Sequence, residues 1–298
     1  MAVNSISNTI LMQVVRLWAW LFLAVLVLIF IISVPLVSGS SVSFLSVRNS
    51  QNILVAITPI LLLGLGQTFV IISGGIDLSV GWAMSFASVI SALALRGAYE
   101  MGLPVPLAVL TGFLTSVICG IGIGLFNGTI IAKLKVPPFI VTLGSAFILR
   151  GLALLFSENT TVIGLPAQVR DYGNEALIYL VRGDSEFAGI YFFSKPELPR
   201  EVLRNMDRII TYPVLITAIV VAFAIYLLKA TKFGRNTYAI GGNVEAATRA
   251  GIPVDSHIIK LYILASTTAS IGGFLSVLRF TAGSAVIGDP LLLSSIAA

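Results

Sequence analysis

Long stretches without ionisable residues alternate with short polar segments along the chain. One such stretch separates Arg16 from Arg48, and another separates Glu100 from Lys133. A helix needs about 20 mainly apolar residues to cross the hydrocarbon core of a bilayer. The pattern therefore predicts membrane-spanning helices near residues 17–37, 53–72, 77–95, 105–131, 136–157, 211–228 and 259–279.

A further apolar stretch begins near Pro290 and reaches the last residue, Ala298. It is too short to cross a bilayer, so we expect an all-α polytopic helix bundle of seven to eight spans in a chain that is a fragment of a longer protein. The first stretch, 17–37, is longer than the apolar core of a signal peptide, and no basic leader precedes it. These features favour a retained helix.

The composition agrees with this pattern. The chain is 57% hydrophobic and only 10% charged, with a mean hydropathy of +1.01. Soluble domains carry about 25% charged residues, so this chain could not cover its own surface with polar groups in water. The net charge is +5, but the basic residues are scattered. We therefore expect lipid around the chain and no nucleic acid partner.

The placement of lysine and arginine predicts the orientation. Lys133 and Lys135 follow the fourth predicted span, and basic residues also fill the segment between the sixth and seventh. Odd–even counting puts both segments on the side of Arg16, and short basic loops are typically cytoplasmic. The predicted organisation is a cytoplasmic N-terminus (1–16) and a transmembrane domain (17–298) with a periplasmic loop (158–210) and a cytoplasmic loop (229–258).

Several kinds of chemistry are missing from the sequence. It contains no Gly-x-x-x-x-Gly-Lys-Ser/Thr loop for ATP and no Gly-x-Ser-x-Gly nucleophile elbow. His257 is the only histidine and Cys119 the only cysteine, so neither a histidine metal cluster nor an intrachain disulfide can form. We expect no enzyme activity and no cofactor in this chain.

A polar interruption lies between the second and third predicted spans. Gly74 and Gly75 allow positive φ and break the helix. Asp77 follows and can cap the N–H groups of the next helix. One interpretation is a tight turn with a capped helix. The other is a broken helix that lines a solute path, because an acid at membrane depth is a functional candidate; the two are compatible.

Small residues recur at every fourth position in two spans, which lets helix backbones approach closely in lipid. The two sets are Ala83, Ala87 and Ser91, and Gly120, Gly124 and Gly128. Arg150 lies inside an apolar stretch, where burial in lipid would cost about 2.5–3.5 kcal/mol. We expect its guanidinium to reach the interface or a watery cavity.

The basic loop contains a short predicted helix. Asn243 is a suitable N-cap, and Glu245 lies in the first turn, where it complements the helix dipole. The helix-favouring residues Ala246 and Ala247 follow, and Gly251 can end the helix. The sequence is compatible with an ordinary interfacial helix or with a helix that docks in a groove of a cytoplasmic partner.

The chain resembles the ribose/simple-sugar permease family of ABC importers. The resemblance covers about residues 50–298 and rests on GQTFVIISGGIDLSVG (66–81), GLFNGTIIAKLKVPPFIVTLG (124–144) with LRGLALL (149–155), and TKFGRNTYAIGGNVEAATRAGI (231–252). It implies about ten helices, a cytoplasmic ATP-binding subunit, a periplasmic solute-binding protein and a second permease copy, identical or different. The loop 158–210 departs from the family pattern in being longer and more charged.

The resemblance also implies roles for individual residues. The ATPase coupling motif would be carried by Glu245, Ala246, Ala247 and Gly251. Apart from the resemblance, our candidates for lining the translocation path are Asp77, Trp82, Asn127 and Phe139. The expected function is the permease subunit of an ATP-driven monosaccharide importer in the bacterial inner membrane. A polyol, nucleoside or signalling molecule remains an alternative cargo. An ion-coupled transporter or a channel is the alternative of another class.

Overall fold

The computed structural model describes residues 2–38, 43–182, 187–193, 196, 198–199, 202 and 206–297, with side chains from residue 17 onward. The chain divides into two compact units, Met1–Ile53 and Leu54–Ala298. The first unit holds α1 (Ala2–Ser38) and the start of α2 (Val47–Ile72). Its segment Leu17–Val37 has the highest hydropathy among the candidate spans, 3.0.

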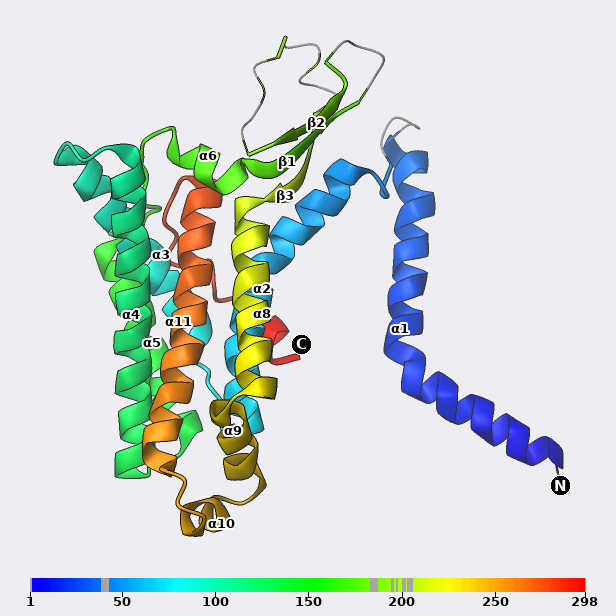
Figure 1. The fold of residues 1–298 in the computed structure, drawn as a ribbon, viewed down its shortest axis with the longest axis vertical. Coiled ribbons are helices and arrows are strands. Elements are labelled where there is room, and N and C mark those ends of the chain that lie inside the picture. The colour runs from blue at the N-terminus through cyan, green and yellow to red at the C-terminus, as the bar shows by residue number, and fades with distance from the viewer. Residues whose placement is uncertain are drawn as a thin grey trace. The chain divides into compact units, whose positions relative to one another are not determined.

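The second unit is a helix bundle (Figure 1). Its long helices after α2 are α3 (Val80–Glu100), α4 (Val105–Leu134), α5 (Pro138–Phe156), α8 (Tyr212–Ala230) and α11 (Val254–Phe280). Its short helices are α6 (Val169–Asn174), α9 (Lys232–Gly242), α10 (Val244–Arg249) and α12 (Leu291–Ala297). In the described part of the chain, seven helices are long and apolar enough to cross a membrane. The predicted helix bundle is confirmed.

Helix α11 is the most enclosed span, with 78% of its most apolar window buried. The glycines of α4 explain how closely α4 approaches it. A Cβ added at Gly120 would lie 2.6 Å from the Cα of Thr267, and one at Gly128 would lie 2.7 Å from the Cα of Ile259. One at Gly124 would overlap the backbone of Ile263. The predicted close packing through this glycine row is confirmed.

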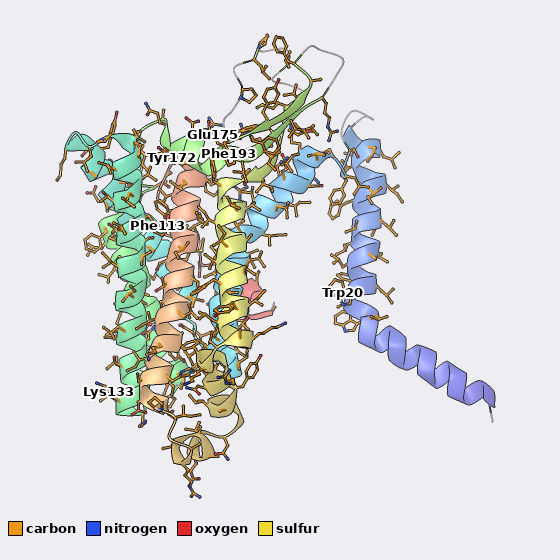
Figure 2. The ribbon with its side chains drawn as sticks, in the orientation of Figure 1. Trp20, Phe113, Lys133, Tyr172, Glu175 and Phe193 are labelled. Atoms are coloured by element: carbon orange, nitrogen blue, oxygen red, sulfur yellow. The ribbon has the colours of Figure 1, made fainter. Side chains whose placement is uncertain are left out.

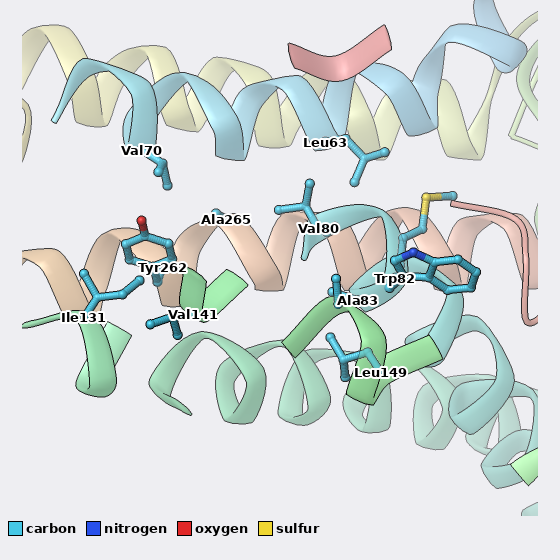
Figure 3. Packing of buried hydrophobic residues seen from close by; sticks show 13 residues of the cluster. Leu63, Val70, Val80, Trp82, Ala83, Ile131, Val141, Leu149, Tyr262 and Ala265 are labelled. Carbon is cyan, nitrogen blue, oxygen red and sulfur yellow. The ribbon is translucent and has the colours of Figure 1, made fainter. Parts of the chain in front are cut away.

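Helix α3 contributes the second row of small residues to the same core. Ala83, Ala87 and Ser91 are fully buried. Figure 3 shows the main cluster of buried apolar side chains, in which Val80 lies near Leu63 of α2 and Ala83 lies near Leu149 of α5. Lipid tails are as apolar as these side chains, so the hydrophobic effect contributes little to contact between the helices. Dispersion between closely packed side chains stabilises the core instead.

The insert between α5 and α8 contains α6 and an antiparallel sheet of three strands in the order β2-β1-β3. The strands are β1 (Ala176–Val181), β2 (Gly189–Phe192) and β3 (Met206–Thr211). The sequence predicts only a loop in this segment and not a sheet. Strand β1 is rich in aliphatic and aromatic residues that favour strands, but its apolar run is too short to separate a strand from a helix by pattern alone.

The two ends of the bundle differ in character. Helix α6 and the sheet lie at one end, and α9 and α10 lie at the other (Figure 1). The basic residues after α4 lie at the α9–α10 end, because Lys135 Nζ pairs with Asp255 Oδ1 of α11 at 2.5 Å. The two basic segments of this unit are therefore on the same end of the bundle.

Candidate functional site

The break between α2 and α3 is built by paired glycines. Gly74 has a φ of +85°, which favours glycine. The N–H of Gly74 donates to the carbonyl of Ile71, and the N–H of Gly75 donates to the carbonyl of Val70, each at 2.9 Å. This is the Schellman arrangement, which satisfies the last carbonyls of a helix. The predicted helix break is confirmed.

Asp77 lies in the break and is fully buried. The prediction that Asp77 can cap N–H groups at the start of the next helix is confirmed for one of them. Helix α3 begins directly after Ser79, whose own side chain makes no capping hydrogen bond. Asp77 Oδ1 accepts two hydrogen bonds from Ser79, from its N–H at 2.8 Å and from its hydroxyl at 2.6 Å. A side-chain oxygen two residues before the N–H that it accepts is in the position of a helix cap.

Two amide side chains from other helices join Asp77. Asn127 of α4 donates from Nδ2 to the Ser79 hydroxyl at 2.9 Å, and Gln67 of α2 donates from Nε2 to the backbone oxygen of Asp77. Both amides are fully buried. We call Gln67, Asp77, Ser79 and Asn127 the break cluster. It ties three helices together through polar contacts that have no competition from water.

The other two predicted path residues lie elsewhere. Trp82 is 7% exposed and belongs to the apolar core, as Figure 3 shows. The guanidinium of Arg150 lies over the Trp82 ring, 5.1 Å from its centre, which is a cation–π contact. Phe139 is 53% exposed on the first turn of α5. The structure thus brings Asp77 and Asn127 into one cluster but not Phe139.

Helix α10 has the predicted limits. Asn243 Oδ1 accepts the N–H of Ala246 at 2.8 Å, which confirms the N-cap. At the other end Gly251 has a φ of +80° and donates to Thr248, while Ile252 donates to Ala247. This is a second Schellman arrangement. Residues 243–252 therefore form one closed, capped turn-and-a-half of helix.

The two faces of α10 differ. Ala247 is buried against Ile240 of α9 and Val254 of α11. Glu245 and Ala246 are exposed, and Glu245 pairs with Arg249 one turn later at 2.6 Å. Such an exposed pair adds little stability. The buried face holds α10 on the bundle and leaves the opposite face free for contact.

Helix α9 contacts both α10 and the end of α2. A Cβ added at Gly241 would overlap the carbonyl oxygen of Ile72, the last residue of α2. On the other side of α9, the Thr237 hydroxyl lies 2.9 Å from His257 Nε2 of α11, and the rings of Phe233 and His257 are 4.6 Å apart. Helix α9 is therefore fitted between α2 and α11 with no spare volume on its α2 side.

Comparison with known proteins places the chain. A family described as the permease component of branched-chain amino acid transport systems matches residues 49–298. The chain belongs to this permease family. No solved structure matches the chain.

Curated relatives of this permease include sugar transport proteins. A fructose import permease protein of Rhizobium meliloti is 33% identical over 241 residues, which cover 80% of this chain but only 58% of that protein. A ribose import permease protein of Bacillus subtilis is 33% identical over 279 residues, or 93% of this chain and 73% of that protein. A xylose transport system permease protein of Haemophilus influenzae is 30% identical, over 86% and 75% respectively. The permease is a multi-pass membrane protein by these matches and by its seven apolar helices.

A cavity of about 860 Å³ lies at the α6 end of the bundle, opposite α9 and α10, and is lined by residues of α4, α6, α8 and α11. Its lining includes Phe113 of α4, Phe274 of α11, and Tyr172 and Glu175 at the α6 end. In Figure 2, Tyr172 and Glu175 lie at the α6 end and Phe113 lies further along α4 toward the opposite end.

Sequence reasoning misses several residues of these sites. Phe113 stands in an apolar run, and Tyr172 and Glu175 stand in the charged insert, so no pattern connects them. Gln67 is a polar residue within an apolar span, and that signal could have identified it. His257 stands near a span end, where one histidine has no distinctive pattern.

The cap of α10 carries a first testable prediction. Asn243→Ala should reduce the local stability of α10 by about 1 kcal/mol, because the N–H of Ala246 loses its acceptor. Hydrogen exchange at residues 244–249 should then be faster by about fivefold, with exchange in α11 unchanged. The same substitution at Asn236, inside α9, is the control and should leave exchange at 244–249 unchanged. Equal exchange in both variants would contradict the role of Asn243.

Proposed function

We propose that the chain is the membrane-spanning permease subunit of an ATP-driven importer that translocates a monosaccharide. The observation that carries this proposal is α10, a capped helix with one face buried on the bundle and the other exposed. The sugar names of the fructose, ribose and xylose relatives support the cargo. ATP would be hydrolysed by a separate cytoplasmic subunit, so this chain would need neither a catalytic group nor a cofactor.

The partners in this proposal follow from the two ends of the bundle. The α9–α10 end would face the cytoplasm and the ATP-binding subunit, because it carries Lys135, Lys232 and Arg249. The opposite end, with α6 and the sheet, would face a periplasmic solute-binding protein. A second permease copy, identical or different, would complete the path. The protein would lie in the bacterial inner membrane with a cytoplasmic N-terminus.

The contacts of α9 suggest how force would reach the membrane. A push on the exposed face of α10 would move α9, since Ala247 of α10 packs on Ile240 of α9. Movement of α9 would displace the end of α2, because Gly241 leaves no space beside Ile72. The break at Gly74 follows directly and is the point where α2 can change direction relative to α3. Nucleotide and binding protein would then shift the populations of two bundle conformations.

Uptake into proteoliposomes tests the proposal. The permease is reconstituted with its ATP-binding subunit, and uptake of labelled ribose, xylose, galactose and fructose is followed with the binding protein outside. We expect uptake of one sugar that requires both ATP and the binding protein. Uptake of a branched-chain amino acid, polyol or nucleoside would change the cargo only. Uptake driven by a proton or sodium gradient without the ATP-binding subunit would replace the function.

Two variants test the coupling assignment within this assay. Gly251→Val should lower ATP-driven uptake by about tenfold, a change typical of lost coupling, because valine is strained at a φ of +80°. Glu245→Ala should weaken binding of the ATP-binding subunit. Insertion and melting temperature of the permease alone should stay near wild type. Normal transport in both variants would remove α10 as the coupling element.

A further inference from the structure

The break cluster contains three buried oxygen atoms without a hydrogen-bond donor. They are Oδ2 of Asp77, Oε1 of Gln67 and Oδ1 of Asn127. All three side chains are 0% exposed. Buried polar atoms are nearly always paired in folded proteins, so three unpaired atoms of the same chemical kind in one cluster call for an explanation.

The hydrogen-bond network fixes which way the two amides point. The backbone oxygen of Asp77 can only accept, so the nitrogen of Gln67 must face it. The single hydroxyl hydrogen of Ser79 donates to Asp77, so Ser79 must accept from the nitrogen of Asn127. Turning either amide over would lose a hydrogen bond. The unpaired atoms are therefore all acceptors, and they need positive partners.

The three side chains are joined through the Ser79 hydroxyl and the backbone of Asp77. Asp77 and Asn127 both bond to the Ser79 hydroxyl, at 2.6 and 2.9 Å. Gln67 bonds to the backbone of Asp77. The carbonyl of Ile76 borders the cluster and receives only long contacts, at 3.5 Å, from the hydroxyls of Thr142 and Tyr262. The Ile76 carbonyl is thus a fourth oxygen beside the break that can accept a further contact.

The charge of Asp77 is not balanced by an ion pair, since no salt bridge in the described part of the chain includes it. A proton on Asp77 Oδ2 would supply one donor, which leaves one of the three oxygens unpaired. A water molecule would supply two donors and no charge. A monovalent cation would balance the carboxylate and would be a positive partner for each oxygen that it reaches. Interrupted helices with free carbonyls are places where transporters hold sodium.

We propose that the break cluster binds a sodium ion, coordinated by the free oxygens of Gln67, Asp77 and Asn127. The ion fastens the break between α2 and α3 to α4. A small ion suits this site because the cluster is closed to solvent. The inference concerns the permease alone, and it holds whatever solute the importer carries.

The test is the sodium dependence of thermal stability. The full chain is purified in detergent, and its melting temperature is measured in sodium, potassium or choline chloride at constant ionic strength and pH. A ligand that binds only the folded state stabilises it in proportion to the logarithm of its concentration. We expect a rise of about 5 °C when sodium replaces choline at about 100 times its dissociation constant, and a smaller rise with potassium. Equilibrium dialysis with radioactive sodium should give one ion per chain.

Variants connect the response to the cluster. Asp77→Asn keeps the side-chain size but removes the charge, and it should abolish the sodium response. Gln67→Met removes one oxygen at similar volume and should weaken sodium binding by about tenfold, which tests the proposal if the Asp77 variant does not fold. Asp255→Asn, on a carboxylate that is exposed and paired with Lys135, is the matched control and should respond as the wild type does.

Two results would overturn the proposal. A melting temperature that is the same in sodium and choline, with no sodium retained in dialysis, would indicate that buried water molecules donate to these oxygens and that no sodium binds. A melting temperature that depends on pH but not on sodium would assign a proton to Asp77. Both results are obtained without the ATP-binding subunit, so they leave the transport assignment untouched.

Discussion

Gly124→Leu is expected to abolish the folded permease. A Cβ at this position overlaps backbone atoms of Tyr262 and Ile263 in α11. A backbone cannot rotate away as a side chain can, so α4 and α11 would have to separate. Overpacking of a close contact typically destabilises by about 1–3 kcal/mol, and here we expect the upper end or more. In size-exclusion chromatography after detergent extraction, the variant should yield little monodisperse protein.

Gly122→Leu is the matched control for this prediction. Gly122 lies in the same helix, half a turn earlier, and a Cβ there meets nothing within 4 Å. Leucine favours helix over glycine by several tenths of a kcal/mol, so this variant should fold as well as the wild type. Similar yields from Gly124→Leu and Gly122→Leu would show that α4 and α11 do not pack as closely as the structure shows.

Gly241→Ala is expected to lower ATP-driven uptake by about tenfold, within the range typical of coupling between two sites. The added methyl group overlaps the Ile72 carbonyl oxygen, so α9 has to move away from the end of α2. The proposed route from α10 to the break at Gly74 would then be interrupted. The bundle itself should remain folded, because α9 lies at one end of it (Figure 1).

Gly242→Ala provides the control next to it in sequence. A Cβ at Gly242 meets nothing within 4 Å, so uptake should stay within about twofold of wild type. Uptake and ATP hydrolysis are measured in the same proteoliposomes. Loss of uptake with continued hydrolysis would indicate that the two subunits bind but no longer transmit movement. Equal uptake in both variants would exclude the contact between α9 and α2 as the route of coupling.

The helices of this protein could be predicted from sequence because the bilayer makes the signal strong. Each span needs about 20 apolar residues, and few other structures tolerate such runs. The limits of α10 could also be predicted, since Asn243 and Gly251 act through local backbone geometry. The glycine row at Gly120, Gly124 and Gly128 predicts a close helix contact, because small residues at every fourth position let two backbones approach. It does not predict which helix is the partner.

The break cluster shows where sequence reasoning stops. Asp77 and Ser79 are neighbours in sequence, but Gln67 and Asn127 reach them from other helices. The donors to Asp77 come from Ser79 and from Gln67, and Asn127 joins the cluster through the Ser79 hydroxyl. A cap on the following helix is the local prediction, and the Ser79 N–H bears it out. The contacts from α2 and α4 cannot be predicted locally.

The amino-acid sequence by itself determined that this chain spans a membrane several times, the approximate positions of its long helices, and which helix surfaces are small enough for close contact. These properties depend on hydropathy and on local backbone preference, which act over a few residues. Only the tertiary structure decided that α11 is the enclosed helix, that Gly241 closes on Ile72, that three strands form in the insert, and that three buried oxygens of the break cluster lack a hydrogen-bond donor. Each of these depends on contacts between segments far apart in the chain, and such contacts are set by packing and hydrogen bonding in the folded bundle.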